Sequence, residues 1–171
     1  MKKFFVYSSY YLSVVLVGLV LMISCDEDDD IRLSDVPQAV VSAFEAKFPD
    51  AGRTEWEKKR GYYVAELWYQ QVEVQAWFEK DGTWRMTETD LGHSVADLPE
   101  AVQQALADSK YASWRVDDLD KYERPIDTFY LVEVETNGQR DRDLFFAPDG
   151  TLLKDDVDKD NHEVTPDYSF N

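Results

Sequence analysis

Apolar side chains recur at helical spacing twice along the chain, once just after Pro37 and once just after Pro99. Proline suits the first turn of a helix, where a missing N–H costs nothing. The first stripe comprises Val36, Val40, Val41, Phe44 and Phe48, and the second comprises Leu98, Val102, Ala105 and Leu106. The sequence therefore predicts two amphipathic helices whose apolar faces pack on a core.

After the first predicted helix, apolar and polar residues alternate, which is typical of strands. A short strand lies around Trp56, and longer alternating runs cover 62–69 and 72–79. If residues 70–71 form a two-residue loop, the facing pairs are Tyr69/Val72, Leu67/Val74, Ala65/Ala76 and Tyr63/Phe78. All four pairs are apolar, so this register is self-consistent.

The turn at Lys80-Asp81-Gly82 sets the next register. A two-residue loop places Phe78 opposite Arg85. A three-residue loop with Gly82 in the left-handed conformation instead pairs Phe78 with Trp84 and Ala76 with Met86. We favour the second register because it keeps the core apolar, and it also sets Trp77 beside Arg85 as a cation–π pair on the other face.

In the second half, residues 128–135 and 140–147 form a hairpin across Asn137-Gly138. A two-residue loop pairs Phe129 with Phe146. A three-residue loop that includes Gln139 pairs Tyr130 with Phe146 and Val132 with Leu144. We favour the longer loop because it reproduces the pair Tyr63/Phe78 of the first half.

The two halves repeat one another in order. The segment from Phe78 to Trp84 returns as Phe146 to Leu152, and Asp35-Val36-Pro37 returns as Asp97-Leu98-Pro99. We therefore predict an α+β fold of two tandem repeats, 34–92 and 93–158. Each repeat is expected to be an N-terminal helix packed on an antiparallel four-stranded sheet.

The N-terminus has the pattern of an export signal. Lys2 and Lys3 precede an apolar run over 4–23, which closes on Ser24-Cys25. A small residue before cysteine resembles the site cut by the lipoprotein signal peptidase, so we expect 1–24 to be a signal peptide and Cys25 to be lipidated and to hold the protein to a membrane. The alternative is an uncleaved membrane anchor, since about 20 apolar residues can span a bilayer.

Acidic residues dominate the charge of the chain, whose formal net charge is −17. This argues against a nucleic-acid partner, because phosphate binding needs clustered Lys and Arg, and favours a basic protein partner or a cation. We expect the acidic segment 25–33 to be a solvated tether and 159–171 to be a solvated acidic tail. The acidic run after Cys25 also resembles signals for lipoprotein export to the outer surface of the outer membrane; that surface and the periplasmic face both stay open.

Catalytic chemistry has little support in the sequence. Neither His93 nor His162 sits in a nucleophile or zinc motif, and Cys25 is the only cysteine, so we predict no catalytic residue, resident metal or cofactor. Alternating acids at Asp156, Asp158 and Asp160, with Asp167 at the twelfth position, resemble a calcium loop, but Asn161 stands where glycine is required. A calcium- or small-ligand-binding accessory lipoprotein is therefore the second interpretation.

The predicted register leaves aromatic residues on the sheet face that the helices do not cover. Tyr62, Trp68, Trp77 and Arg85 are residue types enriched at binding hot spots, so they are the candidates for binding a protein or peptide. The alternative is that the second repeat or a neighbouring chain covers them.

The two repeats resemble the PepSY-like, β-lactamase-inhibitor-protein-like family of secreted proteins and lipoproteins of Gram-negative bacteria. The matching residues are Asp35-Val36-Pro37, Phe48-Pro49, Trp56, Tyr63 and Phe78 through Thr83, then Asp97-Leu98-Pro99, Trp114, Tyr130 and Phe146 through Leu153. The resemblance implies a helix on an antiparallel sheet in each repeat, and in the inhibitor proteins of this architecture the open sheet face grips a protein. Inhibition of a β-lactamase does not follow, because fold does not fix function. The sequence thus predicts a lipid-anchored envelope protein that binds a protein or peptide through the open face of its sheet.

Overall fold

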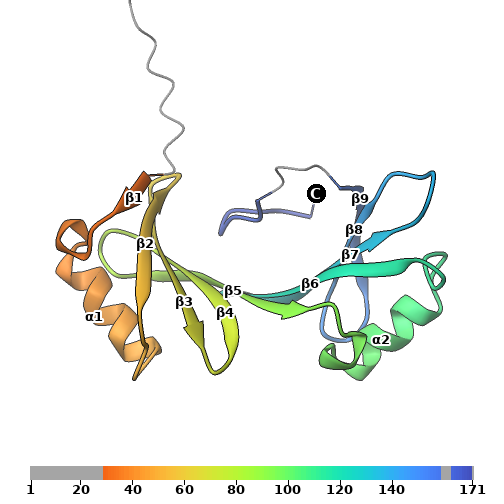
Figure 1. The fold of residues 1–171 in the computed structure, drawn as a ribbon, viewed down its shortest axis with the longest axis horizontal. Helices are drawn as coiled ribbons and strands as arrows, with labels where there is room; N and C mark the ends of the chain where they lie inside the picture. The colour runs from red at the N-terminus through yellow and green to blue at the C-terminus, as the bar shows by residue number, and fades with distance from the viewer. Residues whose placement is uncertain (1–28, 159–162, 171) are drawn as a thin grey trace, which may run out of the picture.

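The computed structural model describes residues 29–158 and 163–170, which contain one antiparallel sheet and two α-helices (Figure 1). Every strand pairs with the next one along the chain. The strands are β1 (Asp29–Ile31), β2 (Thr54–Lys59), β3 (Tyr62–Tyr69), β4 (Val72–Phe78), β5 (Trp84–Gly92), β6 (Arg115–Glu123), β7 (Thr128–Glu135), β8 (Arg142–Phe146) and β9 (Leu152–Val157). The helices are α1 (Gln38–Lys47) and α2 (Glu100–Ala107), and a 3-10 turn precedes each, η1 (Leu33–Asp35) and η2 (Val95–Asp97).

The strands form one sheet and not a separate four-stranded sheet in each repeat. The helix and strands of the first repeat, α1 and β2–β5, are followed by α2 and β6–β9, but β5 pairs directly with β6 through Glu88 and Tyr122. The expected tether also ends in structure, because β1 pairs with β2 along Asp30–Glu57 and Ile31–Trp56. A sheet edge offers unpaired backbone groups, and β1 satisfies those of β2.

Most of the predicted registers are confirmed. Tyr63 lies opposite Phe78, Phe78 opposite Trp84, and Tyr130 opposite Phe146. The pairing of Ala76 with Met86 was wrong, because the register shifts between Trp77 and Phe78, so that Trp77 faces Met86. Such a bulge places one extra residue, Arg85, between the two pairs, so Arg85 is not the cross-strand neighbour of Trp77.

Both helices cover the same face of the sheet, one near each end (Figure 1). Val40 and Phe44 of α1 are buried against the first strands, and Val102 and Leu106 of α2 occupy the same places in the second repeat. Burial of each such side chain contributes about 1.5–3 kcal/mol. The periodic stripes seen in the sequence are therefore two hydrophobic cores on one side of the sheet.

The repeated Asp-Gly turns fix each helix to its strands. Gly82 and Gly150 have φ of 89° and 84°, and a Cβ added to them would lie 2.6 Å from the Ala39 carbonyl oxygen and 2.5 Å from that of Ala101. The Asp81 carboxylate accepts a hydrogen bond of 2.9 Å from the Thr83 N–H, and Asp149 does the same for Thr151. These turns therefore approach the first turn of the helix too closely for any side chain at the glycine.

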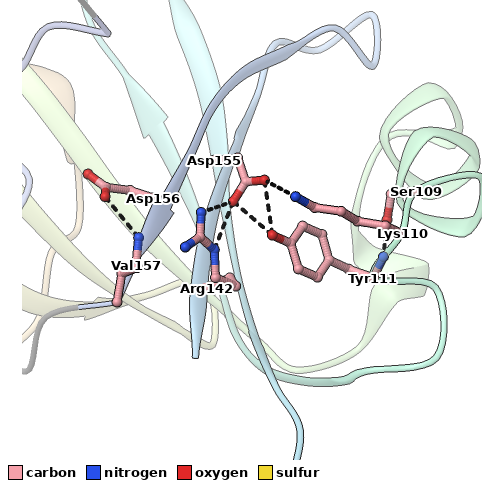
Figure 2. Close-up of polar contacts among 7 residues, drawn as sticks. All are labelled: Ser109, Lys110, Tyr111, Arg142, Asp155, Asp156 and Val157. Atoms are coloured by element: carbon pink, nitrogen blue, oxygen red, sulfur yellow. Dashed lines mark hydrogen bonds and ion pairs between the residues drawn. The ribbon is translucent and has the colours of Figure 1, made fainter. Parts of the chain in front are cut away.

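A polar cluster holds the end of α2 to β8 and β9 (Figure 2). The Asp155 carboxylate accepts hydrogen bonds from Arg142 Nε at 2.8 Å and from the Tyr111 hydroxyl at 3.0 Å, and Lys110 Nζ lies 3.0 Å away. Burial opposes the ionisation of Asp155, but these three partners outweigh it and lower the pKa of the carboxyl. Asp155 therefore acts as an ionised anchor between the sheet and the turn after α2.

The opposite face of the sheet carries a third core, which the end of the chain completes. Residues 163–170 lie over the middle of this face (Figure 1). The buried members are Val64, Trp77, Met86, Tyr122, Phe129, Leu131, Phe145 and Val164. The expectation of an open aromatic face and of a solvated tail was therefore wrong for residues 163–170, because their apolar side chains find this apolar surface.

Replacing Gly82 with alanine should lower the free energy of unfolding by about 2–4 kcal/mol, because the new Cβ meets a backbone oxygen in addition to the unfavourable φ. Gly61 is the matched control, since its φ is 88° but nothing lies within 4 Å of the added Cβ. Gly61→Ala should cost only about 1 kcal/mol. Urea unfolding measures the free energy of unfolding of both variants. Equal decreases in the two variants would contradict the close contact between Gly82 and α1.

Two tryptophans of the first repeat should differ sharply in their contribution to stability. Trp77 is 0% exposed and Trp68 is 68% exposed. We expect Trp77→Ala to cost about 3–5 kcal/mol and Trp68→Ala about 0.5 kcal/mol or less. Thermal and urea unfolding of the two variants check this difference, and a large loss in Trp68→Ala would show that this ring is part of the core.

Candidate functional site

The face opposite to the helices has two parts. The first, which we call the tail-covered surface, lies under residues 163–170. The second, which we call the acidic surface, comprises Glu66, Glu73, Glu88, Asp90, Asp118, Asp120 and Glu133. Both arise from the alternation of side chains along β3–β7, because residues two apart on a strand share a face.

Three of the four predicted binding residues belong to the tail-covered surface. The Tyr62 hydroxyl donates a hydrogen bond of 2.7 Å to Asp167, and the Arg85 guanidinium lies 3.6 Å from the same carboxylate. The Tyr62 ring packs edge-on against Trp77 with centroids 5.9 Å apart. Burial, together with the bond to Asp167, raises the pKa of Tyr62 to about 12. The structure thus brings Tyr62, Trp77 and Arg85 together, but around the protein's own C-terminal segment.

Arg124 is the main polar anchor of that segment, and sequence reasoning missed it. Its guanidinium donates a bond of 2.6 Å to the Tyr168 carbonyl and two bonds, of 2.7 and 2.6 Å, to Asp127. It also lies 4.9 Å from the centre of the Phe129 ring. The side chain is only 5% exposed. A buried guanidinium needs such partners, because an unpaired buried charge is strongly destabilising.

Aromatic rings of the C-terminal segment complete the contact. Tyr168 stacks on Phe145 at 5.1 Å, and Phe170 meets Phe129 edge-on at 5.0 Å. At the other end of the segment, Glu163 lies 3.4 Å from Lys59 of the first repeat. The segment therefore joins both repeats across the middle of the sheet.

Trp68, the fourth predicted residue, lies apart from the other three. It is six residues from Tyr62 along β3, roughly 20 Å at the rise of a strand, and it faces Glu73 of β4. It lines an open groove of about 420 Å³ together with Arg53, Glu55 and Glu66. Trp68 therefore adjoins the acidic surface and not the tail-covered surface.

The acidic surface places like charges directly opposite one another. Asp90 faces Asp120 across β5 and β6, and Asp118 faces Glu133 across β6 and β7. Glu88 faces Tyr122, whose hydroxyl favours the ionised carboxylate. Like charges opposite each other destabilise a sheet, so this arrangement costs free energy in the folded state.

The environment of these acids shifts their ionisation strongly. Burial, reinforced by Glu88 and Asp118, raises the pKa of Asp120 to about 9. Burial also raises the pKa of Glu88 to about 7, and burial followed by the neighbouring Asp143 raises that of Glu133 to about 7. Desolvation disfavours the charged form of a carboxyl, and neighbouring carboxylates add to the effect. A nearby cation would favour the ionised carboxylates and lower their pKa values.

A small pocket opens in the acidic surface between β4, β5 and β6. Its volume is about 160 Å³, and its lining comprises Glu73, Val74, Gln75, Glu88, Asp90, Asp118 and Asp120. Asp120 is 8% exposed, and its carboxylate makes no hydrogen bond or ion pair with any residue in 29–158 or 163–170. A pocket lined by carboxylates can accept a positively charged group or hydrogen-bond donors.

The sequence did contain a signal for this surface. Acids recur two residues apart at 88 and 90 in β5 and at 118 and 120 in β6. Acids at alternate positions of neighbouring strands share one face. The number of acids in the chain obscured this pattern.

The other predicted features fall partly outside the described residues. The signal peptide 1–24, Cys25, His162 and Asp160 are among the residues that the structure does not describe. His93 is exposed. Asp156 belongs to β9 and Asp167 binds Tyr62, while no three acids or histidines in the described segments are grouped to hold a metal ion. None of the helices in those segments is long and apolar enough to cross a membrane.

Solved structures of similar proteins come from several species of Bacteroides. A BLIP-like protein of Bacteroides fragilis is 37% identical with a TM-score of 0.67; the match covers 75% of this chain and 92% of that one. A DUF2874 family protein of Bacteroides ovatus is 32% identical with the same TM-score, over 71% and 86% of the two chains. A protein of Bacteroides eggerthii described as a putative periplasmic protein is 26% identical with a TM-score of 0.67, over 71% and 88%.

A family model matches the chain and agrees with these structural similarities. No curated protein matches the chain. The profile described as "putative beta-lactamase-inhibitor-like, PepSY-like" matches residues 21–74 and again 61–154, so it covers most of the chain in two copies. The fold is the BLIP-like fold, and that description names no catalytic activity. The chain therefore belongs to the PepSY-like, beta-lactamase-inhibitor-like family.

Proposed function

We propose that this protein is a non-enzymatic binding module of the cell envelope, which binds a protein or peptide through Trp68 and the acidic surface. The observation that carries the proposal is the exposure of Trp68, at 68%, on a face whose other aromatic residues are covered. A large exposed aromatic side chain beside a groove is typical of a contact surface. The family is described as beta-lactamase-inhibitor-like, and an inhibitor of this kind also acts by binding a protein.

The electrostatics favour a basic partner. The net charge of −17 attracts cationic proteins over long range and speeds their association. Close to the surface, the carboxylates of β5–β7 are partly buried and face one another, so a positive partner favours their ionised forms and offsets the effects that raise their pKa values. The acidic surface therefore supplies specificity for charge, and Trp68 supplies apolar contact.

Attachment to the envelope is the second part of the proposal. The leader before Cys25 has the pattern of a lipoprotein signal, and the similar protein of Bacteroides eggerthii is described as periplasmic. We place this protein on the outer membrane through acyl chains on Cys25. With Cys25 four residues before β1, the sheet lies close to the membrane surface.

The stability of the protein should fall as the pH rises from about 5 to about 9. Because the folded-state pKa values of Glu88 and Asp120 are raised, their stabilising contribution is complete below the ordinary carboxyl range and is lost as the pH passes about 7 and about 9. We expect the free energy of unfolding to decrease by on the order of 3 kcal/mol over this range.

Urea unfolding at constant ionic strength measures the effect. Asp120→Asn and Glu88→Gln should flatten the profile, whereas Glu45→Gln, which removes an exposed charge from α1, should leave its slope unchanged. A profile that is level or rises with pH in the wild-type protein would contradict this account of the acidic surface.

A photo-crosslinking amino acid at position 68 tests the binding site in the native envelope. With benzoyl-phenylalanine in place of Trp68, we expect a discrete crosslinked species, because the ring would lie at the interface. Ile126 is the matched control, since it is 84% exposed but lies in the β6–β7 turn. Crosslinks of equal yield at both positions, or none at 68, would refute the proposed site.

A further inference from the structure

Asp120 is a buried acid in the lining of the acidic pocket. The residue is 8% exposed, and its carboxylate makes no hydrogen bond or ion pair with the residues that the structure describes. Buried polar groups in folded proteins are normally paired, and an exception calls for an explanation such as a bound group. Asp120 lines the acidic pocket, so a ligand that enters this pocket can reach it.

Among the residues that the structure describes, no basic side chain lines this pocket. Lys121 follows Asp120 but points to the opposite face and lies 3.1 Å from Glu123. Lys59, the nearest lysine on the same face of β2, binds Glu57 at 2.8 Å and Glu163 at 3.4 Å. The lysines nearest to the pocket on these strands are therefore paired with other acids, and in the described part of the chain Asp90 and Asp120 have no ion-pair partner.

The size of the pocket limits what can fill it. The pocket has a volume of about 160 Å³. Pockets for drug-sized ligands are larger, from about 300 Å³ upward. The end of one long side chain fits, and an ammonium or guanidinium group carries three or five donors for the surrounding carboxylates.

We infer that the acidic pocket receives one lysine or arginine side chain of the protein partner, which Asp120 and Asp118 hold by charge-assisted hydrogen bonds. This inference rests on the proposed function and specifies the chemistry of the partner at that site. A bare metal ion is less suited, because the acids in 29–158 and 163–170 are not grouped at metal-binding distances. A basic side chain brings its own donors and needs no converging ligands.

The position of Trp68 also sets the distance between the basic residue of the partner and the residue that contacts Trp68. Trp68 faces Glu73 on the neighbouring strand, and Asp90 faces Asp120, so three strand spacings separate Trp68 on β3 from Asp120 on β6. At about 4.8 Å per strand, this is roughly 14 Å. An extended peptide rises about 3.3 Å per residue, so the partner carries its basic residue about four positions from an apolar residue that covers Trp68.

Two matched peptides test the inference with the full chain. The first is acetyl-Leu-Ser-Gly-Ser-Lys-amide, and in the second norleucine replaces lysine, which removes the charge and keeps the aliphatic stem. We expect the lysine peptide to bind at least about tenfold more tightly in NMR titrations at pH 7.5 and low salt. In Asp120→Asn this advantage should fall below about threefold, and in the control Glu45→Gln it should persist.

Several results would overturn the assignment. An equal lysine advantage in the wild-type protein and in Asp120→Asn would place the basic group elsewhere on the acidic surface. Equal affinity of the two peptides, or no binding of either at 5 mM, would show that the acidic pocket does not bind a basic side chain of the partner. Calcium at 5 mM that raises the melting temperature of the wild-type protein but not of Asp120→Asn, with no lysine advantage, would identify a metal site instead. Each of these outcomes leaves crosslinking at position 68 as a separate test of the proposed function.

Discussion

The hydrogen-bonded pairing of β5 with β6 is the constraint on which the rest of the structure depends. Without it, each helix and its strands would have a core of their own and an edge with unpaired backbone groups. With it, the two repeats share one long sheet, whose second face is wide enough to hold both the C-terminal segment and an open area. The acidic surface exists only because Glu88 and Asp90 of β5 meet Asp118 and Asp120 of β6 at this junction.

The two faces of the sheet are covered in different ways. On the face under the helices, the same packing occurs in both repeats. Val40 and Val102 occupy equivalent places, and a glycine turn contacts each helix. The other face is not repeated, because one C-terminal segment serves both halves and contacts each differently. Its apolar part is buried, and the acids next to it are partly desolvated in a pocket that no basic side chain of the described residues lines. That combination stores an electrostatic cost which a positively charged partner can remove.

Local patterns in the sequence were sufficient to predict what is locally determined. The helices after Pro37 and Pro99, and the registers around Phe78 and Phe146, follow from periodicity and turn chemistry. The docking of the tail did not follow, because the bond from Arg124 to Tyr168 spans 44 residues and has no periodic signal. The sequence grouped Tyr62, Trp77 and Arg85 with Trp68, which lies apart from them, and nothing in the sequence indicated that the chain itself would occupy the surface of the first three. Asp120 could not be singled out among 35 acids until the strand order was known.

Completion of the third core by residues 163–170 also has a consequence for how the protein matures. A chain that is synthesised from its N-terminus can form the described helices and strands before Val164, Tyr168 and Phe170 are added. Until then, the rings of Trp77, Phe129 and Phe145 lie uncovered on a nearly finished sheet. Residues 163–170 are therefore the segment that seals this face, so chains shortened before it would expose an aromatic surface prone to aggregation and be targets for chaperones and proteases.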